Sequence, residues 1–165
     1  MTAMTTPREL FLHELADILY VEQNLTDEVL PKLIDEVQSA ELREGLERHL
    51  EQTRGHVTNL EQVFDALGER PQAEKCVGFE GLKSEHEQLA EEASAELIDL
   101  VDAGAAARTE HYEIAAYSGL IEMARALDER EAVALLDENL KEEREALREV
   151  ESVTKALRDE VKAAT

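Results

Sequence analysis

Apolar residues recur three and four positions apart along most of the chain, and polar residues fill the positions between them. This period matches one face of an α-helix, so the pattern predicts long amphipathic helices. Abundant Ala, Leu and Glu, with no Trp and 3 Pro, favour helix in the same segments. We therefore predict an all-α protein with a single domain over residues 1–165 and helices at about 7–38, 40–67, 79–93, 95–126 and 129–162.

Residues suited to helix ends stand at the predicted boundaries. Thr6 and Glu9 have the spacing of a capping box at the start of the first helix. Ser39 and Asp128 are suited to N-cap the second and the last long helix, because their side-chain oxygens can accept from free backbone N–H groups. Gly68 is expected to end the second helix, since glycine readily adopts the left-handed conformation found after a helix C-terminus.

Two features indicate how the helices connect. Pro31 falls inside the first predicted helix and should kink or divide it, because proline lacks a backbone N–H. The connection between about residues 68 and 95 is too long for a turn and contains the short helix predicted at 79–93. In a bundle, such a connection can cross from one end to the other, so the second and third long helices are expected to run parallel.

Polar residues interrupt the apolar face of each long helix near its middle. A buried carboxylate without a partner is costly, so buried acids are normally protonated, ion-paired or bound to a metal. A hairpin turning near residue 39 places Glu22 near His56. By the same arithmetic, a turn near residue 128 places Glu113 beside Glu143. The interrupting residues are Glu22 in the first helix, His49, Gln52 and His56 in the second, Glu110, Glu113 and Tyr117 in the third, and Glu143 in the last.

A layer of carboxylates in a bundle centre holds like charges together, and divalent cations remove that conflict. Carboxylate and imidazole ligands suit iron or manganese, whereas a structural zinc site more often contains thiolates. The residues leave two alternatives open. The acids can flank the core and pair with Arg108 and Arg144, and His49 or His56 can be a hydrogen-bonded core histidine.

The charge and composition indicate which partners the protein is not expected to bind and in which cell compartment it is expected. The chain carries 39 acids against 17 bases, a net charge of −22, so nucleic acid and membrane are poor partners. The lone Cys76 excludes an intramolecular disulfide and a cysteine-based zinc cluster. The N-terminus lacks the apolar run of a signal peptide, and no stretch approaches the roughly 20 apolar residues that span a bilayer. We therefore expect a cytoplasmic protein.

Several segments carry a pattern typical of one family: ELFLHELADILYVEQNL, RHLEQTRGHVTNLEQVF, KCVGFEGL, EHYEIAAY and LLDENLKEERE. On these segments, which cover nearly the whole chain, it resembles the YciE/YciF family of ferritin-like proteins. The resemblance implies a ferritin-like four-helix bundle with an additional short crossover helix between bundle helices 2 and 3, a dimer, a di-iron centre and a stress-related role. Gln52, Arg54 and Leu147 depart from the family pattern at positions where relatives carry an acid or a histidine.

The spacing and the resemblance together give one leading hypothesis. The protein is expected to be a di-iron carboxylate protein that oxidises Fe(II) with dioxygen or peroxide and serves stress, iron or oxidative protection. Tyr117, one turn from Glu113, is expected to hydrogen-bond a metal-bound carboxylate. The alternatives are a manganese- or iron-dependent peroxide-scavenging protein and a non-catalytic helical dimeric scaffold. The expected metal ligands are Glu22, Gln52, His56, Glu110, Glu113 and Glu143.

The first helix also carries apolar residues beyond its predicted core face, among them Phe11 and Ile18. These residues are expected to form an exposed strip that a twofold partner covers. The sequence therefore predicts a homodimer and not a ferritin-like cage.

Overall fold

The computed structural model describes residues 4–164, and the regular elements within them are all helical. The all-α prediction is confirmed, and every predicted helix has an observed counterpart. The elements in chain order are α1 (Pro7–Asn24), the π-helical turn η1 (Leu25–Val29), α2 (Leu30–Glu36), α3 (Ala40–Ala66), α4 (Val77–Glu92), the 3-10 turn η2 (Ala95–Leu97), α5 (Ile98–Ala126) and α6 (Arg130–Ala164).

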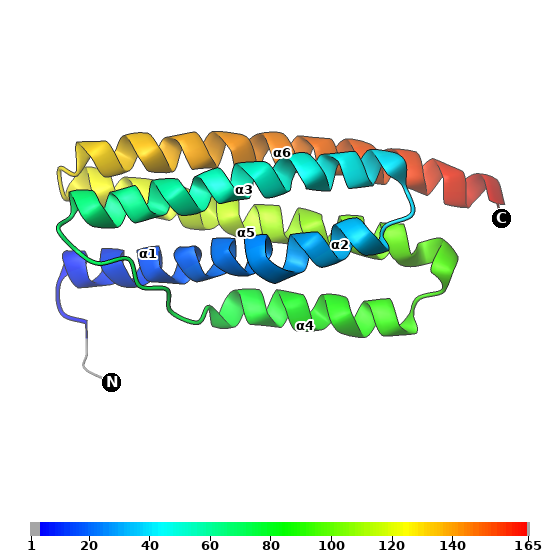
Figure 1. Ribbon diagram of the computed structural model, residues 1–165, viewed down its shortest axis with the longest axis horizontal. Helices are drawn as coiled ribbons and strands as arrows, with labels where there is room; N and C mark the ends of the chain where they lie inside the picture. The colour runs from blue at the N-terminus through cyan, green and yellow to red at the C-terminus, as the bar shows by residue number, and fades with distance from the viewer. Residues whose placement is uncertain (1–3, 165) are drawn as a thin grey trace.

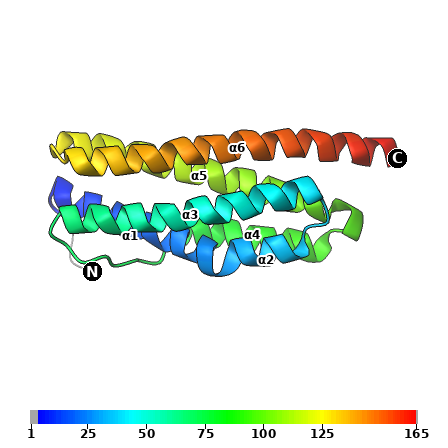
Figure 2. The same cartoon turned by 45° about the horizontal axis from the view of Figure 1, so that its top comes forward.

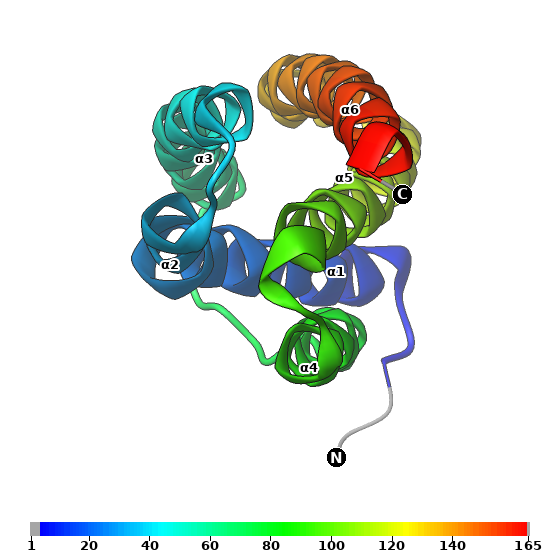
Figure 3. The same cartoon turned by 90° about the vertical axis from the view of Figure 1, so that its right-hand side faces the viewer.

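The long helices lie side by side around a common core (Figures 1 and 3). α1 packs on α3 and α5, and α6 packs on the same two helices. In Figure 1, α3 and α5 run in one direction, whereas α1 and α6 run in the other. α4 lies outside this group against α5 and carries the chain back along the molecule (Figure 2). The parallel course of the second and third long helices, expected from the length of the connection, is therefore observed.

The helical segment formed by α1, η1 and α2 changes helix type just before Pro31, where the sequence predicts a kink or a division. Leu30 donates its backbone N–H to the carbonyl of Leu25, so the turn over Leu25–Val29 is wider than an α-helical turn. A proline ring crowds the carbonyl that lies four residues before it. The wider turn leaves space for the proline ring, so α1 continues into α2 without a break in the helical segment.

The predicted helix ends at residues 6, 39 and 68 are confirmed. The Thr6 side chain accepts from the Glu9 N–H, and the Glu9 carboxylate accepts from the Thr6 N–H, which completes the capping box. The Ser39 side chain accepts from the N–H of Leu42 at the start of α3. Gly68 follows the end of α3 with a φ of 73°, a left-handed conformation in which glycine has no steric penalty.

The prediction that Asp128 N-caps the last helix is wrong. Asp128 has a φ of 60° and lies at the end of α5, where its N–H donates to Arg125 O at 3.2 Å. The next residue, Glu129, donates its N–H to Ala124 O at 2.9 Å, which completes a left-handed helix terminus. Aspartate tolerates this conformation better than most residues with a side chain, so it closes α5 and α6 begins at Arg130.

The prediction that Phe11 and Ile18 form an exposed strip is also wrong. Their side chains are 0% and 1% exposed in the single chain. The segment leading into α4 also pairs with α1, where Glu74 donates its N–H to Ala16 O at 3.0 Å. Because the chain itself covers these residues, they no longer support a dimer, and the homodimer stays a prediction.

The apolar core extends along the length of the bundle. Leu15 and Leu19 of α1, Leu60 of α3, Leu120 of α5 and Leu136 of α6 all belong to it and are almost fully buried. Among the helices of residues 4–164, none has a stretch both long and apolar enough to cross a membrane. Most of the polar residues of the predicted layer are buried among these core residues.

Candidate metal centre

Six ionisable side chains from four helices meet in the middle of the bundle, and each is buried. Helical spacing explains why they share the inner faces, since residues three, four and seven apart lie on one side of a helix. Three of the acids, Glu22, Glu113 and Glu143, are 0% exposed, so water does not solvate them. We call this set the glutamate cluster: Glu22 from α1, His49 and His56 from α3, Glu110 and Glu113 from α5, and Glu143 from α6.

One part of the glutamate cluster comprises His49, Glu110, Glu113 and Glu143. Each of these residues offers one atom suited to metal ligation, and those atoms lie within 4.8 Å of one another. His49 Nε2 lies 3.2 Å from Glu110 Oε1 and 3.9 Å from Glu143 Oε2. This spacing can accommodate one metal ion between α3, α5 and α6.

The other part comprises Glu22, His56 and Glu143, with ligand atoms again within 4.8 Å of one another. His56 Nδ1 lies 2.9 Å from Glu143 Oε1 and 3.4 Å from Glu22 Oε1. Glu143 belongs to both groups. A pair of neighbouring positions with one carboxylate in common is an arrangement that suits two metal ions.

Most polar atoms of the cluster have no hydrogen-bond partner within the described chain. Six carboxylate oxygens are in this condition: one each of Glu22 and Glu110, and both of Glu113 and Glu143. His56 Nδ1 is close to Glu143, but the two atoms are not aligned as a hydrogen bond. Buried polar groups are nearly always satisfied in folded proteins, so this concentration of unpaired oxygens fits a bound cation better than it fits a structural role.

The electrostatics of the metal-free cluster follow from burial and like charge. Burial, reinforced by the neighbouring carboxylates, raises the pKa of Glu113 well above its ordinary value. Burial raises the pKa values of Glu110 and Glu143 in the same way. Burial alone would lower the pKa of His56, but Glu22 and Glu143 outweigh it and raise that pKa to about 11. Protons therefore partly neutralise the cluster when no metal does so.

Hydrogen bonds from surrounding residues orient one side of the cluster. Tyr117 donates its hydroxyl to Glu22 in a short hydrogen bond, as the sequence predicts for a residue that supports a carboxylate. Asn139 donates to the Tyr117 hydroxyl at 3.0 Å and fixes that side chain in turn. His56 Nε2 lies 2.9 Å from Glu142 Oε2, so the ring can donate to Glu142 and direct Nδ1 towards Glu22 and Glu143.

The structure brings together most of the predicted ligands. Glu22, His56, Glu110, Glu113 and Glu143 all lie in the cluster, with Tyr117 beside it. Gln52 is half-buried on α3 and makes none of the side-chain hydrogen bonds found within residues 4–164, so its role as a ligand stays a prediction.

The sequence reasoning left out His49, Asn139 and Glu142 as site residues. His49 lies seven residues before His56 on the same helical face, and this spacing was the available signal. The side chain of Glu142 is 37% exposed, yet it reaches inward to His56. The alternative pairing of the central acids with Arg108 is not observed, because Arg108 pairs with Glu85 at 3.2 Å.

Comparisons of the sequence and of the fold with known proteins identify relatives of this chain. The family described as "Domain of unknown function (DUF892)" matches residues 6–163. Protein YciF of Escherichia coli (strain K12) is 35% identical over 143 residues, which are 86% of this chain and 86% of YciF. The crystal structure of YciF, described as a stress protein, matches with a TM-score of 0.88 at 32% identity and covers 94% of this chain and 99% of YciF. YcfI from Rhodopseudomonas palustris matches with a TM-score of 0.86 at 38% identity, covering 89% of this chain and 94% of YcfI.

Proposed function

The chain belongs to the DUF892 family and is a relative of YciF, and we propose that it is a ferritin-like di-iron carboxylate protein. In this proposal it oxidises Fe(II) with dioxygen or peroxide. Its relative YciF is described as a stress protein, and we extend a protective role against iron and oxidative stress to this chain. The proposal of a ferritin-like fold is supported by the packing of α1, α3, α5 and α6 around one core.

The observation that carries this proposal is the set of unpaired carboxylate oxygens shared between two ligand groups. Six buried oxygens from four glutamates lack partners, and Glu143 belongs to both groups. Without a cation, neighbouring acids in a bundle core only destabilise the fold. The residues present therefore fit a pair of divalent metal ions with oxygen-rich ligation.

The donor atoms divide between two positions. His49, Glu110 and Glu113 would hold one ion, Glu22 and His56 would hold the other, and Glu143 would serve both. Bound iron would supply the redox chemistry with the oxidant, and hard carboxylate ligands favour its ferric state.

The surrounding residues prepare these ligands. The Tyr117 hydroxyl orients Glu22 through its hydrogen bond. Glu142 can accept a hydrogen bond from the N–H at His56 Nε2, which leaves Nδ1 as the ligand atom. The aliphatic side chains of the core exclude water from the acids, which strengthens every charge interaction inside the layer.

Thermal unfolding with and without metal tests the proposal. Wild type and Glu22→Leu/Glu113→Leu would each be unfolded in EDTA and in excess anaerobic Fe(II). A ligand that binds only the folded state at 100 times its Kd adds about 2.7 kcal/mol of stability. We expect wild type to gain stability from iron and the double variant to lose that gain. The proposal fails if wild type gains nothing, or if the double variant gains as much as wild type.

Two further readings share parts of the same site. The oxygen-rich ligand set also suits manganese, so a manganese- or iron-dependent peroxide scavenger is the second candidate, and measuring Fe(II) oxidation against peroxide consumption separates the two. A non-catalytic scaffold is the third candidate. Near-zero iron and manganese after reconstitution, measured by elemental analysis, would support the scaffold and reject both metal functions.

The homodimer is likewise proposed, and it rests on the family resemblance. Light scattering at moderate salt should report a dimer. A monomer or a 24-subunit particle, the size of a ferritin cage, would contradict it.

A further inference from the structure

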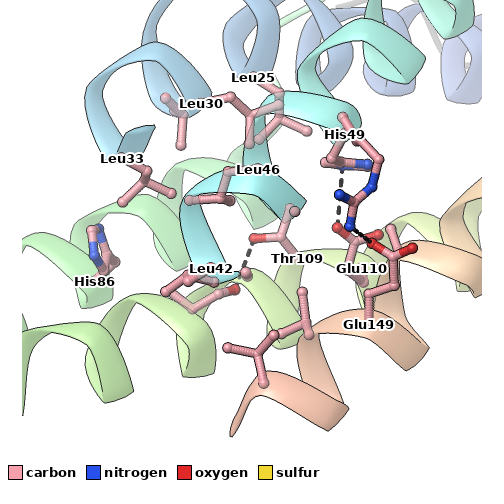
Figure 4. Close-up of a pocket in the computed structure, with 18 of the residues that line it drawn as sticks. Leu25, Leu30, Leu33, Leu42, Leu46, His49, His86, Thr109, Glu110 and Glu149 are labelled. Atoms are coloured by element: carbon pink, nitrogen blue, oxygen red, sulfur yellow. Dashed lines mark hydrogen bonds and ion pairs between the residues drawn. The ribbon is translucent and has the colours of Figure 1, made fainter. Parts of the chain in front are cut away.

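A cavity of about 260 Å³ lies beside the glutamate cluster, between α2, α3, α4, α5 and α6. Its walls are mainly aliphatic, and Figure 4 shows leucines from α2, η1 and α3 gathered around it. Two cluster residues, His49 and Glu110, also line it. The apolar residues that define the cavity include Leu25, Leu30, Leu33, Leu42, Leu46 and Phe79.

The residues that line the cavity are spread along α5, from Ala105 to Glu110. His86 lies on one side of the close-up and His49 with Glu110 on the other (Figure 4). His86 pairs with Asp102 of α5 at 2.7 Å, and Asp102 precedes Glu110 by eight residues, a rise of about 12 Å along a helix. Between them, Ala105 and Ala106 line the cavity with small side chains. The space therefore suits an extended molecule with one end near His49.

The charges around the cavity argue against an ionic ligand. Arg48 pairs with Glu149 at 2.8 Å, and Lys83 pairs with Glu28 at 3.1 Å. No strongly basic side chain among the described lining residues is thus left to hold a carboxylate or phosphate head group. A net charge of −22 disfavours an anion further.

One polar atom at the inner end has no partner. His49 is 7% exposed, its Nε2 faces Glu110, and its Nδ1 makes no hydrogen bond. Depending on the tautomer, that nitrogen can donate to or accept from a hydroxyl or carbonyl group.

We propose that this cavity binds a neutral, mainly apolar molecule of about ten non-hydrogen atoms, with a hydroxyl or carbonyl group at His49. The size follows because a cavity of about 150 Å³ holds benzene, or roughly 25 Å³ for each ring atom. Binding of this molecule does not depend on the metal function proposed above. Medium-chain alcohols and aldehydes have this chemistry.

Gly45 of α3 provides a sharp test. It lines the cavity, and a Cβ built on it meets no atom within 4 Å, so a side chain can begin at this position without strain. Gly55 of the same helix is equally open at its Cβ, is exposed and lies away from the cavity. A glycine inside a helix is unfavourable, so replacing either residue should leave the fold intact or stabilise it.

The experiment is isothermal titration calorimetry of the metal-free wild type, Gly45→Leu and Gly55→Leu with 1-octanol and, separately, with sodium octanoate. We expect saturable binding of octanol to wild type with a negative heat-capacity change, and much weaker binding of octanoate. Each CH2 group displaced from the cavity weakens binding about fourfold, so Gly45→Leu should lose about tenfold or more. Gly55→Leu should match wild type.

The outcomes separate this inference from the proposed function. Absence of octanol binding to wild type, as expected if a second chain fills the cavity, overturns the inference. Equal affinities for Gly45→Leu and Gly55→Leu, or preference for octanoate, overturn it too. Octanol binding in a protein that iron does not stabilise would uphold the cavity ligand and reject the metal function. Stabilisation by iron in a protein that does not bind octanol would uphold the metal function and reject the cavity ligand.

Discussion

Two polar clusters lie around α5, one fully buried and one half-buried, and they contain residues that are adjacent in sequence. The first, which we call the Cys76 cluster, consists of Asp17, Cys76 and Tyr112. The Tyr112 hydroxyl lies 2.9 Å from Cys76 Sγ and donates to Asp17 at 3.1 Å. Cys76 Sγ also accepts from the N–H of Phe79 at 3.2 Å and so caps α4. Burial raises the pKa of Cys76, which keeps it a thiol that can donate to Tyr112.

The glutamate cluster differs because its groups do not satisfy one another. Glu113 follows Tyr112 directly, about 100° further around α5, and neither of its carboxylate oxygens has a partner among residues 4–164. Gly78 shows the contrast in packing, since a Cβ there would lie 3.0 Å from the Tyr112 ring, so the chain is shaped closely around the Cys76 cluster. Polar groups that satisfy one another fit a structural role, whereas buried acids without partners form a site that could hold a cation.

The largest difference between the clusters should appear as pH changes. In the metal-free protein, burial raises the folded-state pKa values of Glu110, Glu113 and Glu143 above the ordinary 4.5, and the pKa of His56 rises from 6.5 to about 11. Both shifts give stability that is complete below the unfolded-state pKa and is lost as pH rises through the folded-state pKa. Stability in EDTA should therefore fall between pH 5.5 and 8.5, by on the order of 1.4 kcal/mol per pH unit for each proton retained.

Denaturant unfolding at several pH values measures this slope. The acidic surface also loses stability as pH rises, so Glu22→Leu/Glu113→Leu is the control, and its slope should be shallower than that of wild type. Added Fe(II) should recover more stability at high pH than at low pH, because metal ligands must be deprotonated. Identical slopes for wild type and the control would mean that the cluster holds no extra protons.

A single substitution at Glu113 should stabilise the metal-free protein. Glu113→Leu removes a fully buried acid whose oxygens have no partners, and we expect a gain of about 1–3 kcal/mol in EDTA. Chemical denaturation measures the change, with Glu113→Gln as a matched control that removes the charge but keeps the polar atoms. The gain for Gln should be the smaller of the two. A loss of stability for Glu113→Leu would show that the acid is paired in the folded protein.

The neighbouring substitution should have the opposite sign and a smaller size. Tyr112→Phe leaves Cys76 and Asp17 without their shared partner, and we expect a loss of about 1 kcal/mol. The loss should be equal in EDTA and in Fe(II), since this cluster is not expected to bind metal. A loss that depends on iron would show that the Cys76 cluster and the glutamate cluster act together, which contradicts a purely structural role for the Cys76 cluster.

Helical periodicity predicted much of the candidate site because it is a local property. Glu22, Glu113 and Glu143 each interrupt an apolar face, and counting residues from the turns places Glu22 near His56 before any packing is known. The same periodicity puts His49 on the face of His56. Counting from a turn does not pair His49 with Glu110, because α3 and α5 are joined by a long connection and meet only through packing of the bundle.

The sequence by itself determined the helices, most of their ends and the acids on their inner faces, because hydrogen bonding and side-chain direction within a helix involve only near neighbours. The tertiary structure alone decided that Phe11 and Ile18 are buried within the single chain. It also decided that Glu142 turns inward to His56 and that an apolar cavity adjoins the glutamate cluster. These features depend on segments far apart in the chain, whose relative positions are fixed by packing of the whole core and leave no periodic signal in the sequence.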